Sequence, residues 1–271
     1  MIKKSIVRNH VGRDVPLERA LKVIKQAGFD GAQLHIGVDS GDVRLGMTDK
    51  EIRGVGKQAR DAGLKAHSLM PSLGQMFNPD PAARVEVIDN FKRGLEICKL
   101  MNIKVLLVHP GAVNEDCPYD LAYQWVTDAF KKLKPTAEKT GCCLAIENVW
   151  NKFLLSPLEA RHFVDQFKSD AVGFYFDVGN IIPYGFAEQW IRILGKRIAE
   201  VHFKDFRRNV GTGAGFVPLL AGDVNWPEVM KELRAIRYNG YVCSEVGGYQ
   251  HNPDYQSLKD ISTAMDAILK M

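Results

Sequence analysis

Four apolar segments in the second half of the chain each carry, near their C-terminal end, one side chain that can bind a metal ion. These residues are Glu147 in LAIENV, Asp177 in VGFYFDVGN, His202 in AEVHFKD and Glu245 in YVCSEVGG. Three carboxylates and one imidazole form an oxygen-and-nitrogen ligand set that suits Mn²⁺, Mg²⁺, Zn²⁺ or Co²⁺. A single such residue would mean little, but four at equivalent places in successive units predict a site for one divalent metal ion.

These segments belong to a regular alternation of strand-like and helix-like runs along the chain. Eight strands are expected, at residues 5–7, 32–36, 65–69, 104–109, 143–148, 172–178, 198–203 and 241–246. The segment after each strand repeats apolar residues at helical spacing, as Leu21, Ile24 and Ala27 do in the first. Gly28 and Gly63 stand shortly before a strand, where the C-cap of a helix is expected.

Eight strands that alternate with eight helices, about 34 residues per unit, predict a single (β/α)₈ TIM barrel, an α/β fold that spans residues 1–271. The strands are apolar on both faces, as a buried parallel sheet requires. A doubly wound open sheet is the less favoured alternative, because no GxGxxG follows the first strand and no Pro/Ser-rich linker divides the chain. In a TIM barrel the catalytic residues lie at the C-terminal ends of the strands, so the four metal-binding candidates should converge at one mouth.

Other side chains are expected around the same mouth. His35, His67 and His109 fall near the ends of the second, third and fourth strands. His67 and His109 are candidates for binding substrate hydroxyls or phosphate, although each could simply be a satisfied hydrogen-bonding group. Trp150 could form an apolar wall over a bound sugar, and core packing would explain it equally well. His10 falls outside the predicted strands and is expected to play no chemical role.

Composition limits the classes of partner. The 46% apolar and 25% charged residues are typical of a globular protein, and 36 basic against 32 acidic residues give a net charge of +4 without a basic stripe. Nucleic-acid binding is therefore not expected. No apolar run approaches the roughly 18–20 residues that cross a bilayer, so no membrane partner is expected. The N-terminal segment lacks the apolar run of a signal peptide, and the five cysteines form no CxxC pair, which together predict a cytoplasmic protein.

Several motifs together resemble those of the sugar phosphate isomerase/epimerase superfamily. They are Glu147 within IEN, Asp177-Val-Gly-Asn180, the VHFKD strand around His202, the GDVNWPEV turn, and Ser244-Glu245. This superfamily includes the xylose isomerase-like barrels, the D-tagatose 3-epimerase type, and the L-ribulose and L-xylulose 5-phosphate 3-epimerases. The resemblance runs through essentially the whole chain and is most specific from residue 143 to residue 246.

The resemblance implies one divalent metal ion bound by Glu147, Asp177, His202 and Glu245. It also implies that Glu147 and Glu245 act as acid and base, and that Arg208 contacts oxygens of a sugar or sugar-phosphate substrate. Such chemistry is physically reasonable. A metal ion can stabilise an enediolate as a Lewis acid, while two carboxylates on opposite faces of a carbon remove and return a proton. Epimerisation at C3 of a ketose or ketose phosphate is the expected reaction.

Whether the substrate carries a phosphate is left open. The segment from residue 207 to residue 229 contains several glycines, and backbone N–H groups near the last strands of a barrel often cradle phosphate. Lys152 and Lys204 are further candidates for contact with an anion. The glycines could equally form only a surface loop.

The sequence also departs from parts of the family. Asn180 stands where tagatose-type epimerases often have His, and Phe153 stands where they have a second Glu; Asn180 is kept as a candidate substrate contact. Apurinic-site endonucleases of the superfamily need imidazole ligands that are missing here. The alternatives are an aldose–ketose (hexulose phosphate) isomerase, a dehydratase of the inosose or 3-dehydroshikimate type, and a non-enzymatic sugar-binding barrel. The sequence is compatible with a homodimer or a homotetramer and does not decide between them.

Overall fold

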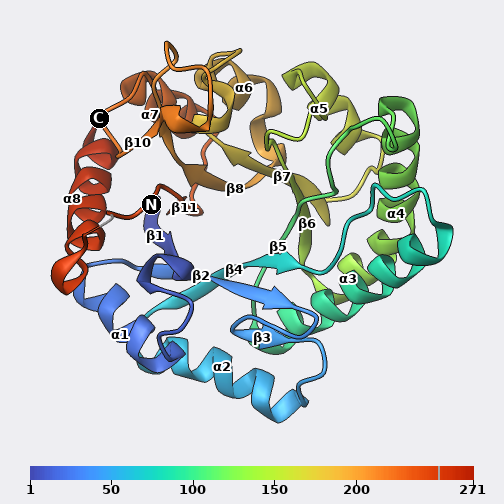
Figure 1. Cartoon of the computed structure of the whole chain (residues 1–271), viewed down its shortest axis with the longest axis horizontal. Helices are drawn as coiled ribbons and strands as arrows, with labels where there is room; N and C mark the ends of the chain where they lie inside the picture. The colour runs from blue at the N-terminus through green and yellow to red at the C-terminus, as the bar shows by residue number, and fades with distance from the viewer. Residues whose placement is uncertain (250) are drawn as a thin grey trace.

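The computed structural model describes residues 1–249 and 251–271. In these residues, eight parallel strands follow one another in the order β1-β11-β8-β7-β6-β5-β4-β2, and β1 also pairs with β2, so the sheet closes into a barrel. Figure 1 shows the helices arranged around the outside of this ring. The predicted (β/α)₈ TIM barrel is therefore confirmed, and the open doubly wound sheet is excluded.

The predicted strands all form, with small shifts at their ends. The strands of the ring are β1 (Lys3–Val7), β2 (Gly31–Gly37), β4 (Lys65–Ser72), β5 (Val105–Val108), β6 (Cys143–Glu147), β7 (Val172–Asp177), β8 (Ile198–Phe203) and β11 (Tyr241–Ser244). Strand β4 runs to Ser72, three residues beyond the predicted end, and this extension matters for His67 below. Short strands β3 (Val43–Arg44), β9 (Asp205–Phe206) and β10 (Phe216–Val217) lie in loops.

The helical segments between the strands also form as predicted. The α-helices of the described residues are α1 (Leu17–Gln26), α2 (Asp49–Asp61), α3 (Pro81–Met101), α4 (Tyr119–Thr140), α5 (Pro157–Asp165), α6 (Ala187–Leu194), α7 (Trp226–Ala235) and α8 (Gln256–Lys270). Their ends follow local capping chemistry. Thr48 and Glu51 form a capping box before α2, and Gly141 ends α4 with a φ of 67°, a left-handed conformation that favours glycine.

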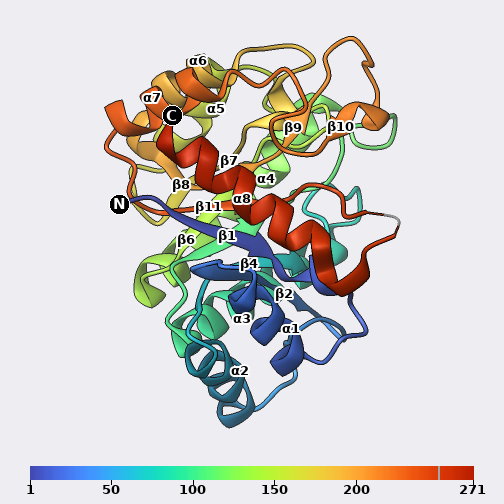
Figure 2. The same ribbon diagram turned by 90° about the vertical axis from the view of Figure 1, so that its left-hand side faces the viewer.

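Two apolar regions hold the barrel together. The larger lies between the sheet and the helices, where residues such as Leu34, Phe91 and Phe174 are fully buried. A small separate cluster of Val105, Leu107, Ala145 and Tyr175 fills part of the barrel interior. Figure 2 shows α8 lying across β1 on the outside of the barrel. Among the described residues, no helix has the length and apolar character needed to cross a bilayer.

Candidate metal centre

The four predicted metal ligands meet at the C-terminal end of the barrel. Glu147 ends β6, Asp177 ends β7, His202 lies near the end of β8, and Glu245 directly follows β11. Asp177 and His202 are direct partners in the pairing of β7 with β8, so their side chains start at the same level of the barrel. One ligand atom from each residue lies within 4.8 Å of the others. The predicted convergence is therefore seen in the structure.

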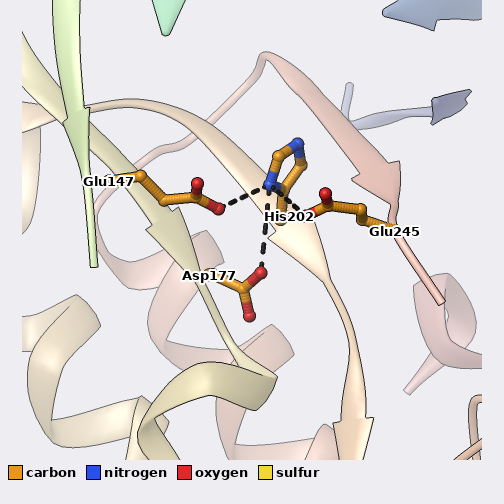
Figure 3. A group of neighbouring side chains, drawn as sticks. All are labelled: Glu147, Asp177, His202 and Glu245. Carbon is orange, nitrogen blue, oxygen red and sulfur yellow. Dashed lines mark hydrogen bonds and ion pairs between the residues drawn. The ribbon is translucent and has the colours of Figure 1, made fainter. Parts of the chain in front are cut away.

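His202 Nδ1 lies at the middle of the cluster. It is 2.8 Å from Glu147 Oε1, 3.1 Å from Glu245 Oε2 and 3.9 Å from Asp177 Oδ2. Figure 3 shows the two glutamates approaching this nitrogen from opposite sides and Asp177 approaching it from a third. Asp177 and His202 are fully buried, Glu147 is almost so, and the Glu245 side chain is 27% exposed. Glu245 is therefore the most exposed of the four ligands.

Lys204 supplies a positive charge to the same cluster. Its Nζ lies 3.0 Å from Asp177 Oδ2 and 2.7 Å from Glu245 Oε2. These two oxygens are shielded from solvent and make no well-directed hydrogen bond. Burial alone would lower the pKa of Lys204, but the Asp177 and Glu245 carboxylates raise it above its ordinary value. Lys204 is therefore an ammonium ion paired with two carboxylates, and its contact with a substrate anion stays a prediction.

The protonation of the ligands follows from the crowding of charges. Burial would raise the pKa of Glu147, but the charges of His202 and His109 lower it below its ordinary value. Burial would also raise the pKa of Glu245, but His202 and Lys204 lower it to about 2. Burial raises the pKa of Asp177 to about 6 despite the neighbouring Lys204. Burial would lower the pKa of His202, but Glu245 and Glu147 raise it well above its ordinary value.

This donor set fits a divalent cation. Three carboxylates carry three negative charges and Lys204 returns one positive charge, so a divalent ion would make the centre neutral. Such an ion would take the place of the proton that the carboxylates attract to His202 Nδ1. Buried carboxylates without a cation would be costly to desolvate, which is why they pair or bind a metal. Glu147, Asp177, His202 and Glu245 are the residues that would hold the ion.

Asn180 supports Asp177 through hydrogen bonds. Its backbone N–H donates to Asp177 Oδ1 at 2.9 Å, and its side-chain amide donates to the carbonyl of Asn148 at 3.0 Å. Asn148 in turn accepts from the Asp177 N–H and donates to the Asp177 carbonyl, both at 2.8 Å. The side chain of Asn180 is buried, its amide nitrogen belongs to this network, and its contact with substrate stays a prediction.

His109 lies at the mouth as predicted. It directly follows β5, and its Nε2 contacts Glu147 Oε2, the oxygen that does not face His202. His109 also lines a cleft of about 500 Å³ beside the centre, together with Gln75 and Asn151. A substrate that reaches the metal centre from this cleft would pass His109, and its contact with substrate stays a prediction.

His67 lies elsewhere. It is the third residue of β4, close to the N-terminal end of the strand, because β4 continues to Ser72. Its ring is buried, stacks on Tyr241 with centroids 4.6 Å apart, and places Nδ1 3.3 Å from Glu200 Oε1. Its predicted place at the mouth is corrected, since it lies inside the barrel below the centre. His35, also near a strand end, bonds to Ser72 Oγ at 2.9 Å and lines a separate cavity of about 470 Å³.

The remaining predicted contacts lie on the loops around the mouth. Trp150 is 40% exposed, packs against Phe206 and Phe216, and donates from Nε1 to the carbonyl of Asn180 at 2.9 Å. Arg208 donates from Nε to the carbonyl of Ile182 at 3.0 Å. Lys152 is exposed. No ion pair or hydrogen bond joins these three side chains to the four ligands within the described residues, so their roles in substrate binding stay predictions.

Sequence reasoning gave no role to two polar residues that the structure buries, Gln33 and the Nε2 end of His10. Gln33, a polar residue two positions before His35 in an apolar strand, hydrogen-bonds to His202. His10 follows the first strand, and its buried Nε2 has no hydrogen-bond partner. Burial lowers the pKa of His10, while the charge of Glu245 opposes the shift. Its position just after a barrel strand was the signal available from the sequence.

Comparison with known proteins agrees with the barrel fold. A family model described as the xylose isomerase-like TIM barrel matches residues 21–269. The chain belongs to this family. No curated protein matches it closely enough to be counted as a relative.

Solved structures share the same xylose isomerase-like barrel. A D-psicose 3-epimerase crystallised in the presence of D-fructose is 17% identical with a TM-score of 0.79, and each chain is covered completely. The apo form of 3-keto-D-glucoside 4-epimerase from E. coli is 16% identical with a TM-score of 0.80, again with complete coverage of both chains. The IOLI protein with a bound zinc atom is 17% identical with a TM-score of 0.80, covering 99% of this chain and 98% of its own. At these identities the likeness establishes the fold.

Proposed function

We propose that this protein is a metal-dependent sugar epimerase that inverts C3 of a ketose. The observation that carries the proposal is the placement of Glu147 and Glu245 on opposite sides of the four-residue cluster (Figure 3). Inversion requires a base on one face of a carbon and an acid on the other, whereas isomerisation between an aldose and a ketose needs only one face. The fold shared with sugar epimerases, including a D-psicose 3-epimerase, supports this choice.

The residues have distinct tasks in this reaction. A divalent ion held by the four ligands would act as a Lewis acid toward negative charge that develops on the substrate oxygens. Glu147, whose Oε2 contacts His109, can remove the proton from one face of the carbon. Glu245 lies on the other side of the cluster and can exchange a proton there, while Lys204 holds its Oε2 at 2.7 Å. The two glutamates exchange tasks in the reverse reaction.

The cleft beside His109 favours a substrate without a phosphate. Its lining contains Ser72, Gln75, Asn151 and the backbone of Gly111, and no lysine or arginine among its described residues. A phosphate dianion is usually held by arginine, lysine or a cluster of backbone N–H groups, whereas hydroxyls bind to neutral amides. The exposed ring of Trp150 offers an apolar surface for the carbon skeleton of a sugar. The location in the cytoplasm and the oligomeric state stay predictions from the sequence.

Proton exchange measured by NMR in deuterated buffer tests the reaction. The protein would be loaded with Mn²⁺ or Co²⁺, incubated with a panel of ketoses and ketose phosphates, freed of the metal and then examined. Deuterium at C3 together with a new diastereomer supports the epimerase. Deuterium at C1 or C2 with an aldose product would instead identify an isomerase, and loss of one water would identify a dehydratase. Binding of a ketose without exchange would identify a sugar-binding barrel and contradict the proposal.

A further inference from the structure

A layer of polar side chains lies inside the barrel directly below the metal centre. Gln33 of β2, Ser68 of β4 and Tyr175 of β7 are each fully buried. The interior of a TIM barrel is usually filled by branched apolar residues, and a buried polar group costs free energy unless it is hydrogen-bonded. Packing alone therefore does not explain why polar residues occupy these buried positions.

Gln33 joins this layer to a metal ligand. Its Oε1 lies 3.0 Å from His202 Nε2, the ring nitrogen opposite to the one that faces the carboxylates. Its side-chain amide donates to Ser68 Oγ and to Tyr175 OH, both at 3.1 Å. The hydroxyls of Ser68 and Tyr175 also lie 3.3 Å from each other. Every polar atom of the Gln33 side chain thus has a partner, and the carbonyl is the end directed to His202.

The backbone is irregular at the same level. In the pairing of β2 with β4, Ala32 faces Ala66 and Leu34 faces Leu69, so Gln33 alone faces the two residues His67 and Ser68. This is a β-bulge, which redirects side chains and is common beside active sites. The bulge brings the hydroxyl of Ser68 within reach of the amide of Gln33. A second register shift, between β7 and β8, occurs beside Tyr175.

The chemistry of the imidazole explains the hydrogen bond between Gln33 and His202. His202 can bind a metal ion through Nδ1 only if that nitrogen keeps its lone pair, and a neutral ring then carries its proton on Nε2. Because His202 is fully buried, the Nε2–H needs an acceptor from the protein. Gln33 Oε1 is that acceptor. We propose that Gln33 is a positioning residue that holds His202 in the tautomer and orientation required for metal binding. The inference rests on the proposed metal centre but not on the identity of the reaction.

Metal affinity measured on the Gln33→Met protein tests the inference. Methionine keeps most of the volume and removes the acceptor, so Co²⁺ and Mn²⁺ should bind roughly 10–100-fold more weakly by titration calorimetry. The visible absorption spectrum of the Co²⁺ protein should change as well, because the imidazole is no longer held in one orientation. Gln33→Glu restores an acceptor and should recover most of the affinity. A Gln33→Met protein with wild-type affinity and an unchanged Co²⁺ spectrum would overturn the inference.

Ser68→Ala is the matched control. It removes a hydroxyl from the same buried layer while Gln33 keeps Tyr175 as a partner and keeps its carbonyl on His202. A role confined to stability predicts that Ser68→Ala and Gln33→Met lower the melting temperature of the metal-free protein alike and leave metal affinity unchanged. The proposed role predicts that only Gln33→Met weakens metal binding. Equal losses of affinity in the two variants would contradict it.

A second measurement examines the wild-type protein with its metal bound. Long-range ¹H–¹⁵N NMR of the Zn²⁺-loaded protein reports which ring nitrogen of each histidine carries a proton. His202, assigned by comparison with His202→Asn, should carry its proton on Nε2. A proton on Nδ1 would exclude the proposed role of Gln33. Failure of the epimerase assay with all sugars would leave this result standing, because no substrate is used.

Discussion

Lys204 Nζ lies 2.7 Å from Glu245 Oε2, so an ammonium ion is joined to a carboxylate that is also a predicted metal ligand. The same ammonium lies 3.0 Å from Asp177 Oδ2. The pair is largely shielded from solvent, and removing one member of such a pair leaves an uncompensated charge. This relationship makes the stability of the protein depend on Lys204 when no metal is bound.

Replacement of Lys204 by methionine should destabilise the metal-free protein. We expect the free energy of unfolding in the presence of a chelator to fall by about 3 kcal/mol, since carboxylates of the centre lose their cation. Added Mn²⁺ should restore most of this loss, so the rise in melting temperature on metal addition should exceed that of the wild type. Urea unfolding with and without metal measures both effects. Lys152→Met, a change of an exposed lysine, is the control, and equal stability of metal-free Lys204→Met and wild type would contradict the account.

Isotope exchange should distinguish the proton-transfer roles of Glu147 and Glu245. Glu147→Gln and Glu245→Gln should each lower the rate of epimerisation by roughly 10²–10⁴-fold while the protein stays folded. Each variant should still exchange the C3 proton of one epimer with solvent deuterium, and the two variants should differ in which epimer exchanges. NMR of the separate epimers in deuterated buffer measures this. Glu115→Gln changes an exposed residue and should behave as wild type. An active Glu245→Gln protein would remove the proposed proton transfer.

The buried pair of His67 and Glu200 should make stability depend on pH. Burial alone would lower the pKa of His67, but Glu200, with a further contribution from Cys243, raises it from 6.5 to about 9. Because the folded-state pKa is above the unfolded one, this stabilisation is fully present below about pH 6.5 and is lost as the pH rises to about 9. The contribution of His67 to the free energy of unfolding should therefore fall by up to about 3 kcal/mol across this window.

Urea unfolding at a series of pH values, in the presence of a chelator, measures this contribution. The slope of stability against pH between 6.5 and about 9 should be shallower in His67→Gln than in the wild type. His162→Gln, which changes an exposed histidine, should leave the slope unchanged. Glu200, Cys243, Tyr238 and Tyr241 are the titratable groups around His67, so the comparison between variants isolates its own contribution. Identical slopes in His67→Gln and wild type would show that folding does not increase the binding of a proton to His67 in this pH range.

The fold and the position of the four ligands could be predicted because both follow from simple periodicities. Alternating strands and helices specify a barrel, and a residue at the end of a barrel strand lies at the mouth. Asp177 and His202 illustrate this, since their pairing across β7 and β8 needed only the strand boundaries. No long-range contact had to be known in advance.

The errors and omissions arose where local backbone departs from that periodicity. His67 was expected at a strand end, but β4 continues through Pro71, and a bulge places both His67 and Ser68 opposite Gln33. Asn180 lies in a short 3-10 helix, Gly179–Ile181, that directs its amide to Asn148. Gln33 itself was not recognised, because one polar residue in an apolar strand gains meaning only from partners distant in sequence. Such contacts depend on how strands are staggered, which no single segment reveals.

The central claim is that Glu147, Asp177, His202 and Glu245 together bind one divalent ion. Anomalous diffraction from crystals grown with Mn²⁺ or Zn²⁺ tests it most directly. We predict one strong anomalous peak at the C-terminal end of the barrel, about 2.0–2.3 Å from one atom of each of these four side chains. A peak coordinated by other residues, or no peak at this cluster in protein saturated with metal, would contradict the account.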